Sequence, residues 1–267
     1  MTLQRLAFQN VTKRFVNTNA GAGLEPVITA VENVTLALND GEVVSLIGPS
    51  GCGKSTLLNM GSGLDRPSAG TVFVDGEEVD GPNSHVAFML QKDLLLPWRT
   101  IEDNVQLGQE IQGVGKTERR AKAAELLAKF HLSEFARAYP HQLSGGMRQR
   151  AALARTMVMD PDVLLLDEPF SALDAQTKMM LQMDLARTVT DENKTAFLIT
   201  HDLVEAVALS DRVLVMSQRP GRIIEEIPVD LPDRDKPLKR RGHTKMGGYI
   251  AKLMQLLDIG QDEGAAA

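Results

Sequence analysis

A glycine-rich loop constrains this sequence more than any other feature. The segment Gly48-Pro-Ser-Gly-Cys-Gly-Lys-Ser55 fits the pattern G-x-x-x-x-G-K-[ST] and directly follows the apolar run Val43–Ile47. In this pattern the glycines let backbone N–H groups turn inward at a helix N-terminus, where the helix dipole also favours phosphate. A wholly apolar run is what a parallel strand covered on both faces requires. The sequence therefore predicts an α/β chain that binds nucleotide phosphates at the end of a buried strand.

The residues of this phosphate loop (Gly48–Ser55) have different expected tasks. Lys54 should reach the β- and γ-phosphates, and the Ser55 hydroxyl should ligate Mg²⁺. Cys52 lies between two glycines beside Lys54, so we expect a reactive thiol inside the loop that bound Mg-ATP protects. A plain strand-to-helix turn with an exposed lysine is the less favoured alternative. The expected nucleotide contacts are Gly48, Pro49, Ser50, Gly51, Cys52, Gly53, Lys54, Ser55 and Thr56.

Composition excludes several classes of protein. Apolar residues make up 43% of the 267 residues and the net charge is −6, so neither disorder nor general nucleic-acid binding is expected. No apolar run approaches the ~18 residues of a membrane-spanning helix, and the N-terminus lacks the composition of a secretory signal. The single cysteine excludes an intrachain disulfide. We therefore expect a cytoplasmic protein without a transmembrane span.

Short apolar runs alternate with longer helical patterns, as in an α/β layer architecture. Between about residues 93 and 160 the pattern is nearly all helical, which predicts an inserted helical subdomain. After about residue 230 we expect a linker and a short helical extension, with the basic stretch 234–245 as a solvated tail or, less favoured, a contact for lipid headgroups. Strands are expected at 3–8, 42–47, 71–74, 85–90, 163–166, 195–200 and 212–216, and a loop at 16–26. Helices are expected at 117–130, 145–159, 174–190, 202–209 and 249–257.

Two strand ends carry the polar side chains expected beside bound phosphate. Asp167 and Glu168 follow one apolar run, and His201 follows another. Ligands bind at the carboxyl ends of strands in an open parallel sheet. We expect Asp167 to hold Mg²⁺ opposite Ser55, and Glu168 to polarise an attacking water. His201 could orient that water, although a lone histidine there is more often a core or capping residue.

A second glycine motif opens another predicted helix. Leu143-Ser-Gly-Gly146 places a hydroxyl and free backbone N–H groups at a helix N-terminus, which makes a second anion site. The alternative is an N-cap serine followed by flexible glycines, and the two interpretations are compatible. One chain thus has two anion sites but only one set of Mg²⁺ ligands.

These motifs together resemble an ATP-binding-cassette (ABC) ATPase. The resemblance is carried, over about residues 1–230, by the phosphate loop, Gln91, Leu143–Gly146, Asp167-Glu168, Ser171-Ala-Leu-Asp174 and His201. It implies a P-loop NTPase fold with an N-terminal antiparallel β subdomain, an inserted helical subdomain, and hydrolysis of ATP with Mg²⁺. It also implies a dimer, most simply of identical chains, in which the phosphate loop of one subunit faces Ser144, Gly145 and Gly146 of the other. Gln91 would sense the γ-phosphate and join the Mg²⁺ shell, Asp174 would transmit signals between subunits, and Phe15 would stack on adenine.

The segment Leu94–Trp98 resembles cassettes of importers for nitrate, sulfonate, taurine, bicarbonate and thiamine-precursor pyrimidines, as does the stretch 208–222. The resemblance implies that Leu94–Trp98 contacts an integral membrane permease, which an external solute-binding protein serves. The cassette would then lie on the cytoplasmic face of the inner membrane. From composition alone, Leu95, Leu96 and Trp98 would simply cap the core of the helical subdomain.

Other functions use the same catalytic motifs. A cassette of an exporter or of a lipid-extraction complex is separated from an importer cassette only by Leu94–Trp98. A soluble cassette ATPase acting on chromosomes or ribosomes usually has coiled-coil insertions or tandem cassettes, which this sequence does not show. A P-loop kinase does not account for Leu143–Gly146.

Overall fold

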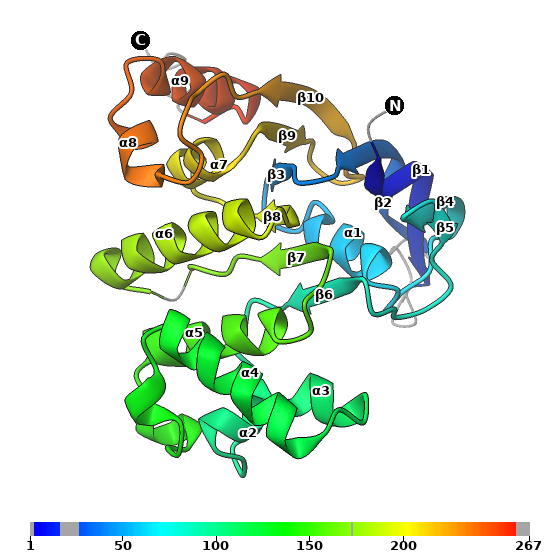
Figure 1. Ribbon diagram of the computed structural model, residues 1–267. Helices are drawn as coiled ribbons and strands as arrows, with labels where there is room; N and C mark the ends of the chain where they lie inside the picture. Colours follow the sequence, from blue (N-terminus) through cyan, green and yellow to red (C-terminus); the bar gives the residue numbers. More distant parts are fainter. Residues whose placement is uncertain (1–2, 17–26, 172, 260–267) are drawn as a thin grey trace.

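The structure of the chain, a computed structural model, describes residues 3–16, 27–171 and 173–259. Its core sheet consists of β3 (Val43–Ile47), β6 (Val86–Met89), β7 (Val163–Asp167), β8 (Thr195–Ile199), β9 (Arg212–Met216) and β10 (Ile223–Pro228), in the order β10-β9-β3-β8-β7-β6 (Figure 1). All neighbours are parallel except β10, which runs antiparallel to β9. Every residue of β3, β7 and β8 is buried, because both faces of these interior strands are covered.

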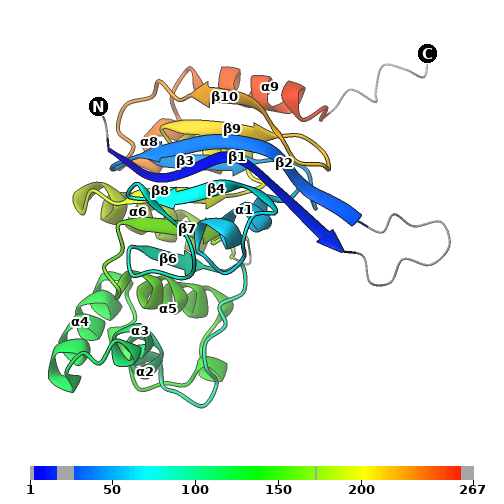
Figure 2. The same cartoon turned by 90° about the vertical axis from the view of Figure 1, so that its right-hand side faces the viewer.

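A second, antiparallel sheet packs against the core sheet near α1 (Lys54–Gly61). It consists of β1 (Gln4–Val16), β2 (Val27–Asn39), β4 (Ala69–Val74) and β5 (Glu77–Glu78), in the order β2-β1-β4-β5. Figure 2 shows β1 and β2 as a long ribbon pair that extends past the core. The rings of Phe8 in β1 and Phe197 in β8 lie 6.4 Å apart between centroids, so the two sheets share one apolar core.

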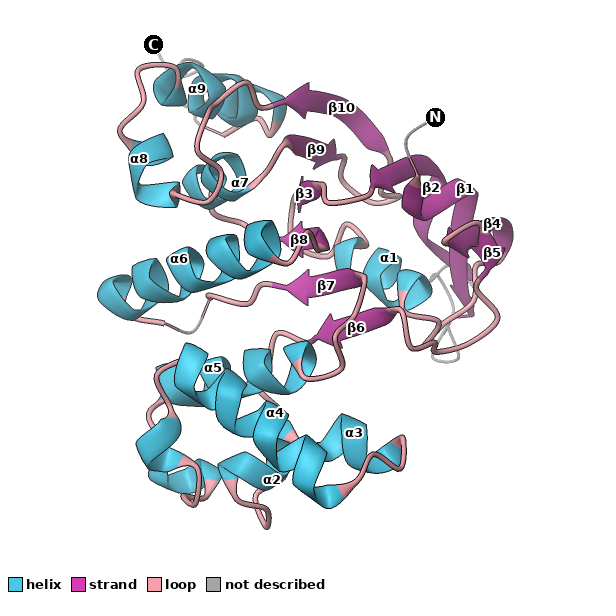
Figure 3. Cartoon of the chain, in the orientation of Figure 1, coloured by secondary structure: helices cyan, strands magenta, loops and turns pink. Residues whose placement is uncertain are grey.

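Helices occupy most of the chain between β6 and β7. They are α2 (Ile101–Val105), α3 (Leu107–Ile111), α4 (Lys116–Lys129) and α5 (Gly145–Met157). Figure 3 shows them grouped beyond the β6 edge of the core sheet. Buried residues of α4 and α5 form one apolar cluster with residues of β6 and β7, so the helical part is fixed to the sheet by α5.

The helices that follow β7 cover other parts of the sheet, the first of them packing on β7 and β8. They are α6 (Ala175–Asp191), α7 (Leu203–Leu209), α8 (Pro237–Arg241) and α9 (Met246–Leu256). Residues of α7, α9, β9 and the strand β10 share a third apolar cluster. In the parts of the chain that the structure describes, no helix is both long and apolar enough to cross a membrane.

Most predicted elements are present with ends shifted by a few residues, and the expected antiparallel sheet and helical insertion are observed. The strands β2, β5 and β10 and the helix α8 were not predicted. The first strand is longer than expected, because β1 continues through several register shifts to Val16. The rest of the expected loop, residues 17–26, lies outside the described residues.

The expected solvated basic tail is correct for Lys236, Lys239 and Lys245, which are exposed, and wrong for Arg240, which is buried. Residues 234–245 include α8, and every basic side chain in this stretch has a partner within the chain. Arg240 is 4% exposed and donates to backbone carbonyls. The other pairs are Arg234 with Asp211, Lys236 and Lys239 with Asp233, Arg241 with Gln182, and Lys245 with Asp230.

Candidate functional site

The carboxyl ends of the core strands open into a cavity of about 720 Å³. The phosphate loop, the ends of β7 and β8, and parts of β1 and β2 form its walls. It therefore lies at the sheet edge where an open parallel sheet places its ligands. The predicted site residues that line it are Phe15, Gly48, Ser50, Gly51, Gly53, Lys54, Ser55, Thr56, Gln91, Asp167, Glu168 and His201.

The phosphate loop has the geometry that its glycines predict. Gly53 has a φ of +107°, and a Cβ there would lie 2.8 Å from the carbonyl oxygen of Ala30 in β2. Only glycine fits this close approach. Helix α1 begins at the next residue, and no side chain of the described residues caps its N-terminus. Its first N–H groups are therefore open toward the cavity, as an anion site requires.

Lys54 is held along this loop rather than in solvent. Its Nζ donates to the carbonyl oxygens of Gly48 at 2.7 Å and Pro49 at 2.9 Å. The residue is 9% exposed. The ammonium group is thus fixed in the wall of the cavity, where a phosphate would meet it.

Ser55 and Asp167 form the part of the site that suits a divalent cation. The Ser55 hydroxyl donates to the Asp167 carboxylate, which is 8% exposed at the end of β7. Burial raises the pKa of Asp167, and the hydrogen bond from Ser55 and the charge of Lys54 oppose that shift. A buried carboxylate and a hydroxyl are oxygen ligands of the kind that Mg²⁺ prefers.

Glu168 is the point at which two other predicted residues meet. Its Oε2 accepts a hydrogen bond from Gln91 Nε2 at 3.0 Å and lies 3.3 Å from His201 Nδ1. The Glu168 backbone has a φ of +46°, an uncommon conformation for a residue with a side chain. Three segments far apart in the sequence therefore place their polar groups around one carboxylate.

Gln91 reaches this point because α5 holds the chain that follows β6. Gln149 Nε2 donates to the Gln91 carbonyl at 3.1 Å, and the Arg155 guanidinium donates to the Leu94 carbonyl at 2.7 Å. The same helix begins at the Ser144–Gly146 motif. Gln91 and this motif are thus both attached to α5.

Ser144, Gly145 and Gly146 do not line the cavity of their own chain. Ser144 is exposed, and its Oγ accepts from the backbone N of Met147 at 3.3 Å as an N-cap. A Cβ at Gly146 would lie 2.6 Å from a methyl group of Thr177 in α6. The motif is therefore a separate, outward-facing helix N-terminus.

Phe15 lies at the open side of the cavity. Its side chain is 42% exposed, and the Lys13 ammonium group lies 5.1 Å from the ring centroid. A partly exposed aromatic ring at this place is suitable for stacking on a base.

Two residues of the phosphate loop, Pro49 and Cys52, do not line the cavity. Cys52 is 1% exposed and packs in the apolar core between the two sheets. The positive φ angles of Gly51 and Gly53 turn backbone toward the cavity and leave the Cys52 side chain on the core side. The expected accessible thiol is therefore wrong, and maleimide labelling of the folded chain should be slow.

Arg219 is a cavity residue that the sequence analysis missed. Its guanidinium donates twice to the carbonyl oxygen of Gly51, at 2.8 and 3.1 Å. The only local signal was the Arg-Pro-Gly turn after β9. The contact with Gly51 spans 168 residues, which spacing along the chain cannot reveal.

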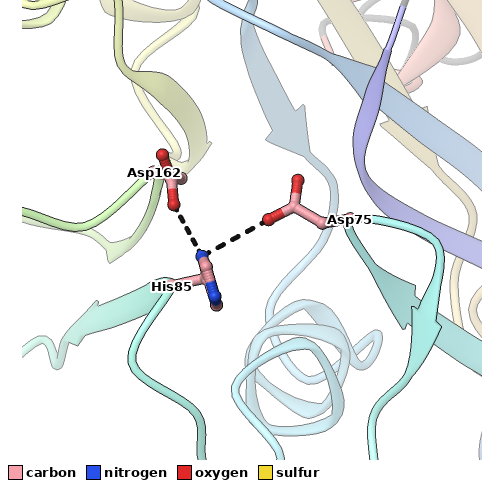
Figure 4. Close-up of side chains that lie close together, drawn as sticks. All are labelled: Asp75, His85 and Asp162. Carbon is pink, nitrogen blue, oxygen red and sulfur yellow. Dashed lines mark hydrogen bonds and ion pairs between the residues drawn. The ribbon is translucent and has the colours of Figure 1, made fainter.

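A second polar cluster lies at the amino ends of β6 and β7, away from the cavity (Figure 4). His85 Nδ1 lies 2.7 Å from Asp162 Oδ2 and 3.5 Å from Asp75 Oδ2. The hydrogen bond to Asp162 raises the pKa of His85, with burial opposing. Arg5 also pairs with Asp75 at 2.9 Å. Because Arg5 already supplies positive charge, the cluster joins the two sheets without needing a cation.

The segment Leu94–Trp98 is only partly core. Leu95 is buried, whereas the exposed fraction is 53% for Leu94 and 71% for Trp98. Trp98 therefore does not cap the helical subdomain, contrary to the alternative derived from composition. The segment presents a large apolar side chain to its surroundings.

Comparisons with known proteins agree with this geometry. The ABC transporter family model matches residues 31–171. The chain belongs to the ABC transporter family. It is an ATP-binding cassette, a class of ATP hydrolases, and the predicted fold class is confirmed by solved cassettes. The dimeric cassette MJ0796, bound to ADP and Pi in a post-hydrolysis state, superposes with a TM-score of 0.74 at 32% identity, over 85% of this chain and 99% of that chain.

Several curated relatives of the cassette are more similar in sequence. An uncharacterized ABC transporter ATP-binding protein of Methanocaldococcus jannaschii is 46% identical over 95% of this chain and 91% of its own length. A taurine import ATP-binding protein of Pseudomonas aeruginosa is 45% identical over 76% of this chain and 78% of its own. A nitrate import ATP-binding protein of Synechocystis sp. is 42% identical over 80% of each.

Proposed function

We propose that this cassette is the ATP-hydrolysing subunit of an importer that takes up a small solute of the nitrate, sulfonate, taurine, bicarbonate or thiamine-precursor kind. The observation that carries the hydrolytic part is the meeting of Gln91, Glu168 and His201 at the mouth of the phosphate-loop cavity. The import-type relatives support the transport part.

Hydrolysis is phosphoryl transfer to water, so the protein contributes mainly positioning and charge. Lys54 and the open N–H groups of α1 bind the β- and γ-phosphates. Glu168 accepts a proton from the attacking water, and His201, 3.3 Å from Glu168, orients that water on the γ-phosphate side. Phe15 stacks on the adenine.

Mg²⁺ would be held by Ser55, Gln91 and Asp167. The fit rests on Asp167, a carboxylate 8% exposed whose pKa burial raises, so a cation there would recover part of its lost solvation. The ion would supply charge that neutralises the phosphates during transfer.

A second cassette completes the site. The outward-facing Ser144–Gly146 motif supports binding of a γ-phosphate held by another copy of the chain, since it lies outside its own cavity. The dimeric state of the similar cassette supports the same arrangement. We propose a dimer of identical chains.

The permease contact is assigned to Leu94–Trp98. Trp98 is 71% exposed, and an exposed aromatic side chain is a common anchor of interfaces. The Arg155 guanidinium of α5 donates to the Leu94 carbonyl, and Gln149 of the same helix donates to the Gln91 carbonyl. Movement of a bound permease would therefore displace Gln91 through α5. The proposed location is peripheral, on the cytoplasmic membrane face, with an external solute-binding protein acting on the permease.

Copurification from native membranes in mild detergent tests the importer. The tagged chain and an Ile111→Glu control should each retain a multi-span permease, identified by mass spectrometry, while Trp98→Glu should lose it and still bind ATP. Ile111 is a suitable control because it is 78% exposed in the same helical part.

Three results would each contradict a part of this proposal. A dimer with no membrane partner would favour an ABC ATPase that works away from the membrane. A permease that copurifies equally well with Trp98→Glu would remove the assigned contact. A partner that is itself an exporter or lipid-extraction permease would replace the import direction.

A further inference from the structure

A polar network, buried at Gln182, Thr200 and Glu205, connects the C-terminal helix α8 with the residues on either side of His201. Its members are Arg241, Gln182, Glu205, Lys178, Thr200 and Asp202, which come from α8, α6, the end of β8 and the start of α7. None of these residues lines the nucleotide cavity. This polar network therefore has no part in the hydrolytic chemistry described so far.

Helix α8 is fixed to the body of the cassette by Arg240. This guanidinium is 4% exposed and donates to the carbonyl of Ser210 at 2.7 Å and to that of Leu231 at 2.5 Å. Arg241, the next residue, consequently has a defined place. It is not a free surface cation.

Arg241 sets the orientation of a buried amide. Its guanidinium donates to Gln182 Oε1 at 2.6 Å, and Gln182 Nε2 donates to Glu205 Oε2 at 2.9 Å. Gln182 is 1% exposed and Glu205 is 2% exposed. With Oε1 facing a guanidinium, the amide must present its N–H to Glu205. Without Arg241 the amide still directs its N–H to the carboxylate, but its buried Oε1 loses its donor and the Gln182 side chain is held less firmly.

Glu205 in turn holds both neighbours of His201. It accepts from the Thr200 hydroxyl, and it lies 2.9 Å from Lys178 Nζ, which also pairs with Asp202 at 2.8 Å. Burial raises the pKa of Glu205, and its bonds with Thr200 and Lys178 oppose that shift. Gln182, Thr200 and Lys178 thus stabilise the charged form of this buried carboxylate.

Thr200 and Asp202, which the polar network holds, lie on either side of His201, whose imidazole faces Glu168. Asp202 N also donates to Thr200 Oγ1 at 3.0 Å, which closes the turn around His201. His201 itself is exposed, and its Nδ1 lies 3.3 Å from Glu168 Oε2. Its direction therefore depends on this turn.

We propose that Arg241 is a positioning residue for ATP hydrolysis, acting through Gln182 and Glu205 on the turn that aims His201 at Glu168. The proposal rests on the proposed role of His201. It makes the C-terminal extension part of the hydrolytic machinery, because the orientation of His201 depends on a side chain of α8.

Steady-state ATPase kinetics of the full chain test the proposal. Arg241→Ala should lower kcat about fivefold, the effect of losing roughly one hydrogen bond, with the KM for ATP changed by less than about twofold. Arg241→Lys should recover part of the loss. The matched control is Lys239→Ala on the same helix, which removes only an exposed pair with Asp233.

A double-mutant cycle distinguishes an effect transmitted through this polar network from a general effect on folding. Gln182→Met should lower kcat to a similar extent, and Arg241→Ala should have no further effect in that background, because the path is already interrupted. Equal losses from Lys239→Ala, additive losses in the cycle, or an unchanged kcat in Arg241→Ala would each overturn the proposal.

His201→Gln, measured in parallel, shows which claim fails. A wild-type kcat in His201→Gln would remove the role of His201 and the positioning role of Arg241 with it. A large loss in His201→Gln together with wild-type kinetics in Arg241→Ala would leave the proposed function standing and overturn only the connection to α8.

Discussion

The two glycine-containing helix starts of this chain face different surroundings. At the phosphate loop, Gly53 lies against β2, and Lys54, which is 9% exposed, donates to carbonyl oxygens of the loop. The Ser55 hydroxyl pairs with the buried Asp167. At the second start, Ser144 is exposed and caps its own helix. The first therefore has a cation, a hydroxyl and acidic groups around it, whereas the second has only N–H groups and a hydroxyl.

This difference separates binding from turnover. One chain brings the phosphate loop and Asp167 together in one cavity, whereas the Ser144–Gly146 motif lies outside that cavity. Substitutions at the phosphate loop should therefore weaken ATP binding by the isolated chain. Substitutions at Ser144–Gly146 should leave that binding intact and reduce turnover.

Lys54→Ala should have the largest effect on binding. Loss of a charged donor to phosphate should weaken ATP affinity roughly 10- to 100-fold, measured by isothermal titration. The neighbour control is Lys92→Ala, since Lys92 is exposed and lies outside the cavity lining. Wild-type affinity in Lys54→Ala would mean that the loop does not hold the nucleotide.

Ser144→Ala should have a moderate effect confined to turnover. We expect kcat to fall about tenfold, because one donor to the partner's γ-phosphate is lost, while ATP affinity of the dilute chain stays unchanged. The helix should lose about 1 kcal/mol from its N-cap, so thermal unfolding is measured beside kinetics. A fall in affinity without a fall in kcat would place Ser144 in its own chain's site.

These contrasts also show what could be predicted from sequence. Lys54, Asp167, Glu168 and His201 were placed correctly at one edge because each follows an apolar strand, and parallel strands end at the same edge. The sequence of the loop does not show which way each of its side chains points. Cys52 therefore was assigned to the wrong side.

Long-range contacts and short polar helices were also beyond a sequence pattern. Helix α8 is five residues long and rich in charge, so it has no apolar periodicity, and its burial depends on Arg240 reaching distant carbonyls. The strand β2 pairs with β1 through several register shifts, which obscure the alternation expected of a strand. Arg219 and Arg241 act on residues far away in the chain.

His85→Gln should have the smallest effect, and only on stability. The hydrogen bond to Asp162 raises the pKa of His85 in the folded chain. Its contribution is therefore complete below the unfolded value near 6.5 and is lost as the pH rises through the raised folded value. The melting temperature of His85→Gln should lie further below wild type at about pH 5.5 than at about pH 8.5. An equal difference at both would exclude the charged pair.

The most direct test of the account is the ATP-dependent mass of Glu168→Gln, measured by light scattering. Removing the proposed base should reduce turnover by about 10²-fold or more, so ATP stays bound and a dimer of the 29.1 kDa chain should accumulate. Adding Ser144→Arg should return the protein to a monomer that still binds ATP. A Glu168→Gln chain that binds ATP but stays monomeric, or a double variant that still forms the dimer, would contradict a site completed by the Ser144–Gly146 motif of a second copy.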